Sequence, residues 1–171
     1  MNLFLKLRQL PVIVRWAAFA LSLYVLFETS MRVGAPPTFD KTKVPFEIEF
    51  TYNLGHQFLY GFFALTLLLV LPQQTLYKRA TLLWLPALVA LVGMLDEWNQ
   101  SFRYRGSGMN DVGSDVMGAV HILILALWFS KARKSWHTVL LISTQVWIGV
   151  TWNLVVVYAP DPPLPFFPVG Q

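Results

Sequence analysis

Twenty residues in the second half of the chain carry most of its candidate chemistry. The stretch DEWNQSFRYRGSGMNDVGSD, residues 96–115, holds four carboxylates and two arginines. It lies between two apolar runs, TLLWLPALVALVGML and VMGAVHILILALWF, which are typical of membrane-embedded helices. Carboxylates perform acid–base chemistry or bind cations, and arginines bind phosphate through paired hydrogen bonds. Charge concentrated between two such runs predicts a site at one surface of a membrane.

Helical spacing assigns the candidate residues to three stripes. Residues three, four and seven positions apart share one face of a helix. The three stripes combine polar, aromatic and small residues: Asn53–His56–Tyr60, Gly93–Glu97–Gln100 and Asp111–Asp115–Gly118. Consecutive helices usually lie side by side. We therefore expect the stripes to converge on one pocket, next to Arg103 and Arg105 of the intervening loop.

The residue types in this pocket predict two kinds of role. The catalytic candidates are Glu97, His56, Asp115 and Asp111, and the substrate-binding candidates are Arg105, Gln100, Tyr60 and Asn53. A carboxylate and an imidazole can exchange protons with a substrate. The same groups could instead hold a divalent cation such as Mg²⁺ or Mn²⁺, which prefer oxygen ligands. A simple ion pair between Arg105 and one of the aspartates would also account for part of the pattern.

Five apolar segments supply the elements that position these residues. They span roughly 10–29, 54–71, 80–95, 112–130 and 138–159. Each is near the length of about 20 residues that crosses the hydrocarbon core of a bilayer. Only 13% of the chain is charged, whereas a soluble domain has about a quarter of its residues charged. These features predict an all-α, polytopic membrane bundle of about five transmembrane helices, in a single domain over residues 1–171.

The basic residues predict the orientation of this bundle. Eight of the thirteen lie at alternate ends of the segments: Lys6, Arg8, Arg15, Lys78, Arg79, Lys131, Arg133 and Lys134. Cytoplasmic ends of membrane helices carry an excess of Lys and Arg. We therefore predict that the N-terminus, as an uncleaved anchor, is inside and the C-terminus is outside. All nine acids would then lie at or beyond the outer ends of the spans.

Two segments outside the spans have their own patterns. FEIEF, residues 46–50, alternates polar and apolar positions, which predicts a short extended or interfacial piece. The tail 160–171 contains five prolines. Because proline interrupts helices, we expect this tail to lie along the outer surface.

The polar spacing resembles that of a known family. The run Glu97-x-x-Gln100-x-Phe102-x-x-Arg105, followed by Asp111 and Gly118, is similar to the signature of the VanZ-like family, small bacterial membrane proteins named for a teicoplanin-resistance factor. HQFLYGFFAL, residues 56–65, is similar to an earlier motif of that family. The resemblance covers about residues 53–125. It implies a protein of the bacterial inner membrane with a link to the cell envelope or to glycopeptide resistance.

Three functions fit the outward-facing pocket. The first is an enzyme or binding site for a lipid-linked envelope intermediate, such as a polyprenyl phosphate. The second is a non-catalytic partner that docks another membrane protein or a glycopeptide through its charged cap. The third is a small transporter, against which the absence of an acid or arginine near mid-membrane argues. The basic residues form no continuous face, which excludes nucleic acid as a partner.

Overall fold

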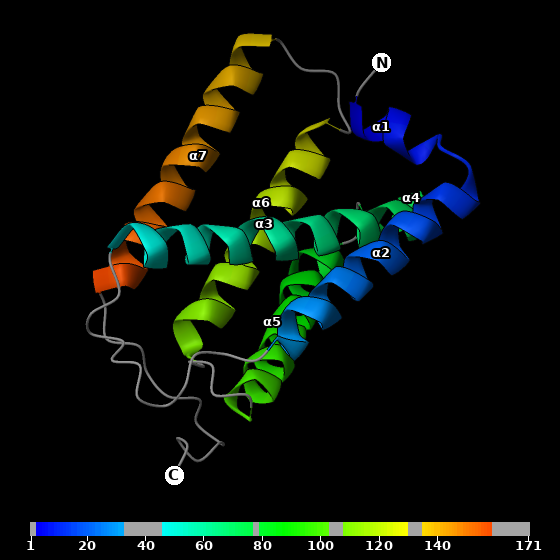
Figure 1. Ribbon diagram of the computed structural model, residues 1–171. Helices are drawn as coiled ribbons and strands as arrows, with labels where there is room; N and C mark the ends of the chain where they lie inside the picture. Colours follow the sequence, from blue (N-terminus) through cyan, green and yellow to red (C-terminus); the bar gives the residue numbers. More distant parts are fainter. Residues whose placement is uncertain (1–2, 33–45, 77–78, 103–107, 130–134, 159–171) are drawn as a thin grey trace.

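The computed structural model describes residues 3–32, 46–76, 79–102, 108–129 and 135–158, and within these ranges every regular element is a helix (Figure 1). The helices are α1 Leu3–Arg8, α2 Val12–Met31, α3 Phe46–Val70, α4 Gln73–Leu76, α5 Arg79–Ser101, α6 Met109–Phe129 and α7 Ser135–Tyr158. Five of them, α2, α3, α5, α6 and α7, are long and apolar enough to cross a membrane. The prediction of an all-α membrane bundle with five spans is confirmed.

Helix α3 begins earlier than the sequence predicted. It starts at Phe46, so FEIEF forms its first turns and the prediction of an extended piece is wrong. The rings of Phe46 and Phe50 lie 5.7 Å apart, because positions four apart share a helix face as readily as alternate positions share a strand face. Glu47 and Glu49 occupy the first turn, where the helix dipole favours negative charge.

Helix α5 also extends beyond its apolar run. The predicted segment stopped at residue 95, whereas the helix continues to Ser101. Asp96, Glu97 and Gln100 therefore lie on the last turns of a spanning helix, as the stripe Gly93–Glu97–Gln100 predicted for the last two. Pro86 lies inside the same helix, which is tolerated in membrane bundles because neighbouring groups satisfy the carbonyl that proline leaves free.

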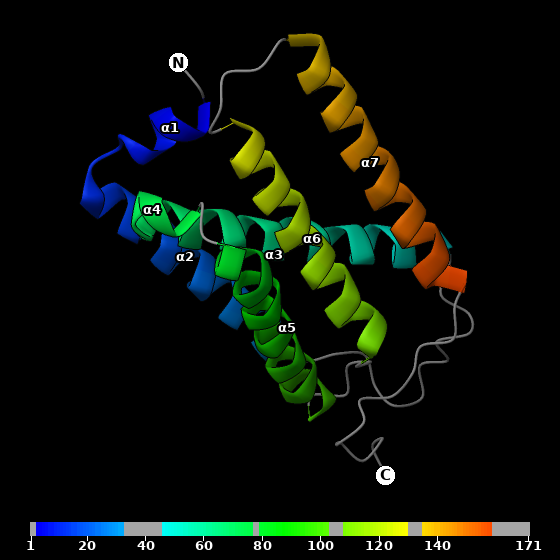
Figure 2. The ribbon, with the colours of Figure 1, turned by 180° about the vertical axis from the view of Figure 1, so that it is seen from behind.

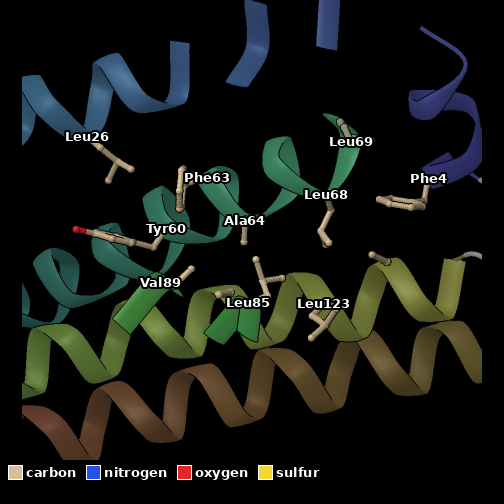
Figure 3. Close-up of a cluster of buried hydrophobic side chains, with 12 residues drawn as sticks. Phe4, Leu26, Tyr60, Phe63, Ala64, Leu68, Leu69, Leu85, Val89 and Leu123 are labelled. Atoms are coloured by element: carbon tan, nitrogen blue, oxygen red, sulfur yellow. The ribbon is translucent and has the colours of Figure 1, made fainter. Parts of the chain in front are cut away.

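Helix α3 forms the centre of the molecule. In its most apolar stretch 56% of the residues are buried, compared with 11% in α2 and 17% in α7. Phe63, Ala64 and Leu68 of α3 pack into a cluster that also contains Leu26 of α2 and Leu85 of α5 (Figure 3). The apolar outer faces of α2 and α7 remain exposed, as expected of helices that face lipid.

Glycines allow α3 and α6 to touch backbone to backbone. A Cβ atom added to Gly118 would overlap the carbonyl oxygen of Gln57, and one added to Gly61 would lie 3.2 Å from the carbonyl oxygen of Gly118. Small residues at such crossings permit close helix packing in membranes. His56 precedes Gln57, and Asp115 lies one turn before Gly118. The crossing therefore brings the candidate residues of α3 and α6 together.

The helix ends gather at two opposite ends of the molecule (Figures 1 and 2). At one, which we call the basic end, Arg8 and Arg15 donate hydrogen bonds to the carbonyl oxygens of Leu68 (2.7 Å) and Leu69 (2.8 Å) at the last turn of α3. Their charges complement the negative end of the helix dipole. At the other, the acidic end, α5 finishes and α6 begins, with Asp96, Glu97, Asp111 and Asp115.

Candidate functional site

The candidate site is organised by a buried pair of His56 and Asp115. Nδ1 of His56 on α3 lies 2.8 Å from Oδ1 of Asp115 on α6, and both side chains are buried. A carboxylate that accepts a hydrogen bond from Nδ1 fixes the orientation of the imidazole ring. When Nδ1 is the donor, the same bond selects the tautomer in which Nε2 is the basic nitrogen.

Glu97 and Asp111 approach the same histidine. His56, Glu97 and Asp111 each present an atom that could bind a metal, and these three atoms lie within 4.8 Å of one another. Glu97 is completely buried, and its Oε2 accepts a hydrogen bond from the backbone N–H of Gly108 at 3.2 Å. Its other oxygen, Oε1, has no hydrogen-bond partner in the described chain. The bond to Gly108 connects the end of α5 to the residue that precedes α6.

Gly93 makes room for the carboxylate of Asp115. A Cβ atom added to Gly93 would lie 2.5 Å from Oδ2 of Asp115, so any larger residue at this position would displace the aspartate. The sequence placed Gly93 in one of the three stripes as a small residue. The atom that approaches it most closely is a side-chain oxygen of Asp115.

Asp96 is a member of the site that the sequence reasoning missed. The hydroxyl of Tyr60 donates a hydrogen bond to Oδ2 of Asp96 at 2.8 Å, and Tyr60 is completely buried. Asp96 falls outside the Glu97 stripe because adjacent residues point about 100° apart around a helix. Two consecutive acids at the end of an apolar helix were the signal, since each is costly at that depth without a partner.

A cavity of about 770 Å³ lies beside this group. Its wall includes Arg32 at the end of α2, Tyr52 and His56 of α3, and Asp96 and Gln100 of α5. The ring centroids of Tyr52 and His56 are 4.9 Å apart. His56 and Asp96 thus belong both to the cavity wall and to the buried polar group.

The structure confirms that the three stripes converge. It brings together His56, Glu97, Asp111 and Asp115, and it places Tyr60 against Asp96. Gln100 is buried and contributes to the cavity wall, and Asn53 is buried one turn before His56. Arg103 and Arg105 lie outside the described residues. The catalytic and binding roles assigned to these residues stay predictions.

No protein-family model, curated protein or solved structure matches this chain. The resemblance to the VanZ-like family therefore rests on the polar spacing in the sequence. What the site can do follows from its own geometry.

The concentration of carboxylates limits that chemistry. Glu97 and Asp115 are completely buried, and each keeps one oxygen without a hydrogen-bond partner in the described chain. A buried, unpaired carboxylate costs on the order of several kcal/mol. Such groups avoid this cost by taking up a proton, by sharing one with a neighbour or by binding a cation. The site could therefore exchange protons or organise an ionic ligand.

Proposed function

We propose that the chain is a VanZ-like protein of the bacterial inner membrane that binds the phosphate-bearing headgroup of a lipid-linked envelope intermediate at its acidic end. The cavity beside His56 is the observation that carries this proposal. Its volume, about 770 Å³, is within the range of about 300 to 1,000 Å³ that small-molecule sites occupy. Its wall combines a cation, Arg32, with apolar side chains such as Ile48 and Leu59 and with the carboxylates of Glu47 and Asp96. Arg32 suits the phosphate of such a lipid, and the carboxylates suit hydrogen-bond donors of its headgroup.

Each polar residue of the cavity wall would contact a different part of such a headgroup. Arg32 would bind the phosphate through charge-assisted hydrogen bonds, which are stronger than neutral ones. Gln100 offers amide contacts to a sugar or phosphate oxygen. His56, oriented by Asp115, would donate or accept a proton at the bound group. Arg105, a substrate-binding candidate in the sequence, is a second expected phosphate ligand because a guanidinium group binds phosphate through paired hydrogen bonds.

Binding of a matched pair of ligands tests this proposal. Purified protein in nanodiscs should be stabilised by farnesyl phosphate and not by farnesol, as measured by thermal unfolding. Arg32→Gln should weaken the phosphate ester by about 10- to 100-fold, because a hydrogen bond to a charged group contributes about 1.5 to 3 kcal/mol. Lys6→Gln is the control, since Lys6 is exposed on α1 at the basic end.

Two results would contradict the proposal. Equal stabilisation by ester and alcohol would show that the phosphate is not recognised. Absence of any stabilisation would favour the alternative in which the acidic end docks a protein or glycopeptide without binding a lipid.

A further inference from the structure

We propose that His56, Glu97 and Asp111 bind a divalent transition-metal ion of the Mn²⁺–Zn²⁺ class, and that Asp115 orients the histidine ligand. Such an ion would be held by protein atoms alone, so its binding does not depend on whether the cavity binds a headgroup. The three residues come from α3, α5 and α6, so the ion would join the three helices that form the acidic end.

The separation of the three ligand atoms suits one ion. Metal–ligand distances of about 2.0 to 2.2 Å keep two ligand atoms of one ion about 3 to 4 Å apart. The atoms of His56, Glu97 and Asp111 lie within 4.8 Å of one another. Small side-chain rotations would therefore complete the coordination without movement of the helices.

The hydrogen bonds around these atoms are those of a metal site. A histidine that binds a metal through one nitrogen almost always donates its other N–H to a carboxylate or carbonyl group. His56 fits this arrangement, because its Nδ1 lies 2.8 Å from Oδ1 of Asp115, as expected for a ring that binds an ion through Nε2. Glu97 is supported similarly, since the N–H of Gly108 bonds to Oε2.

A second observation points to a ligand at this place. Oε1 of Glu97 belongs to a completely buried side chain and has no hydrogen-bond partner in the described ranges. One doubly charged cation would compensate the carboxylates of Glu97 and Asp111 in a region where unpaired charge is costly. An orphaned oxygen beside a supported imidazole belongs to the donor set that such an ion requires.

The donor set also selects among ions. Carboxylates alone suit Mg²⁺ and Ca²⁺, whereas imidazole favours transition metals such as Zn²⁺. A single histidine with two carboxylates fits Mn²⁺ or Zn²⁺ best. The sequence alone allowed either Mg²⁺ or Mn²⁺. One imidazole nitrogen among the ligands makes Mg²⁺ the less favoured ion.

Metal content of the purified protein tests the inference. The full chain in detergent is stripped with a chelator, dialysed against micromolar Mn²⁺ or Zn²⁺, and assayed by mass spectrometry of the metal. We expect one tightly held ion per chain. Glu97→Gln and the double variant Glu97→Gln/Asp111→Asn should lose it. Asp115→Asn should keep it with an affinity lowered about 10- to 100-fold, as for other residues that orient a ligand.

Glu49→Gln is the matched control, because it removes an exposed acid from α3 outside the site and should bind as the wild type does. Gel filtration and circular dichroism verify that each variant is folded. A wild-type chain that holds no ion would overturn the inference whatever the variants do. So would a folded double variant that binds as tightly as the wild type.

The metal assay is independent of the headgroup assay. A metal-loaded protein that ignores farnesyl phosphate contradicts headgroup binding alone. A protein that binds the ester and holds no ion contradicts the metal site alone.

Discussion

Among single residues, Glu97 has the most constrained surroundings. It is completely buried at the end of a spanning helix, with Oε2 bonded to Gly108 and a carboxylate oxygen near the ligand atoms of His56 and Asp111. A purely structural acid in this position would be satisfied by its hydrogen bonds, yet Oε1 has no such bond in the described chain. This unpartnered oxygen is the atom that the proposed metal site would use.

Replacement of Glu97 by glutamine removes the charge of the side chain and keeps its shape. The amide oxygen of the substituted side chain can still accept the hydrogen bond from Gly108, so we expect Glu97→Gln to change the melting temperature in detergent little. Metal binding should be lost, because the substitution removes the charge of one of the three ligand groups. Glu49→Gln should change neither quantity. Loss of folded protein would assign Glu97 a structural role, and full binding would show that its charge is not needed.

The residue-level predictions from sequence succeeded where helical spacing decided them. His56, Glu97, Asp111 and Asp115 converge because each lies on a helix whose face the spacing defines. Asp96 was missed because the spacing rule selects residues on a single face of α5. In the structure two adjacent faces contribute, with Asp96 directed toward Tyr60 and Glu97 toward His56. Which helix neighbours each face is a tertiary property that the spacing does not contain.

At the scale of elements, the crossing of α3 and α6 sets the geometry of the site. Gly61 and Gly118 let the two backbones meet, and the pair of His56 and Asp115 lies about one turn away from this contact. The sequence included Gly118 in a stripe without predicting which helix it would touch. It also placed the start of α3 too late, because a five-residue alternation cannot be distinguished from the first turns of an amphipathic helix.

Substitution of Gly118 by alanine tests this crossing. The added methyl group would overlap the carbonyl oxygen of Gln57, so α3 and α6 must separate. Overpacking of this kind costs about 1 to 3 kcal/mol, and we expect a lower melting temperature together with weaker ligand binding. Gly55→Ala is the control for stability alone, because nothing lies within 4 Å of a Cβ atom there and alanine favours helix, whereas Gly55 itself lines the cavity. Equal stability of the two variants would show that the crossing tolerates greater separation.

At the scale of the whole molecule, charge is divided between the two ends. Arg8 and Arg15 cap the last turn of α3 at the basic end, whereas the carboxylates of α5 and α6 lie at the acidic end. Cytoplasmic ends of membrane proteins carry the excess of Lys and Arg. The division therefore supports an orientation with the acidic end, and the cavity beside it, facing away from the cytoplasm.

Reporter fusions test this orientation. A phosphatase reporter is active outside the cytoplasm, and a fluorescent protein folds inside it. Fusions after Gln74, between α3 and α5, and after Lys134, before α7, should read cytoplasmic, whereas a fusion at Gly170 should read external. The reason is that five spans separate the two termini, so they must lie on opposite sides. A cytoplasmic reading at Gly170 would mean that one of the five helices does not cross. Reversed readings at all three positions would instead place the carboxylates inside, where a headgroup on the outer face of the membrane could not reach them.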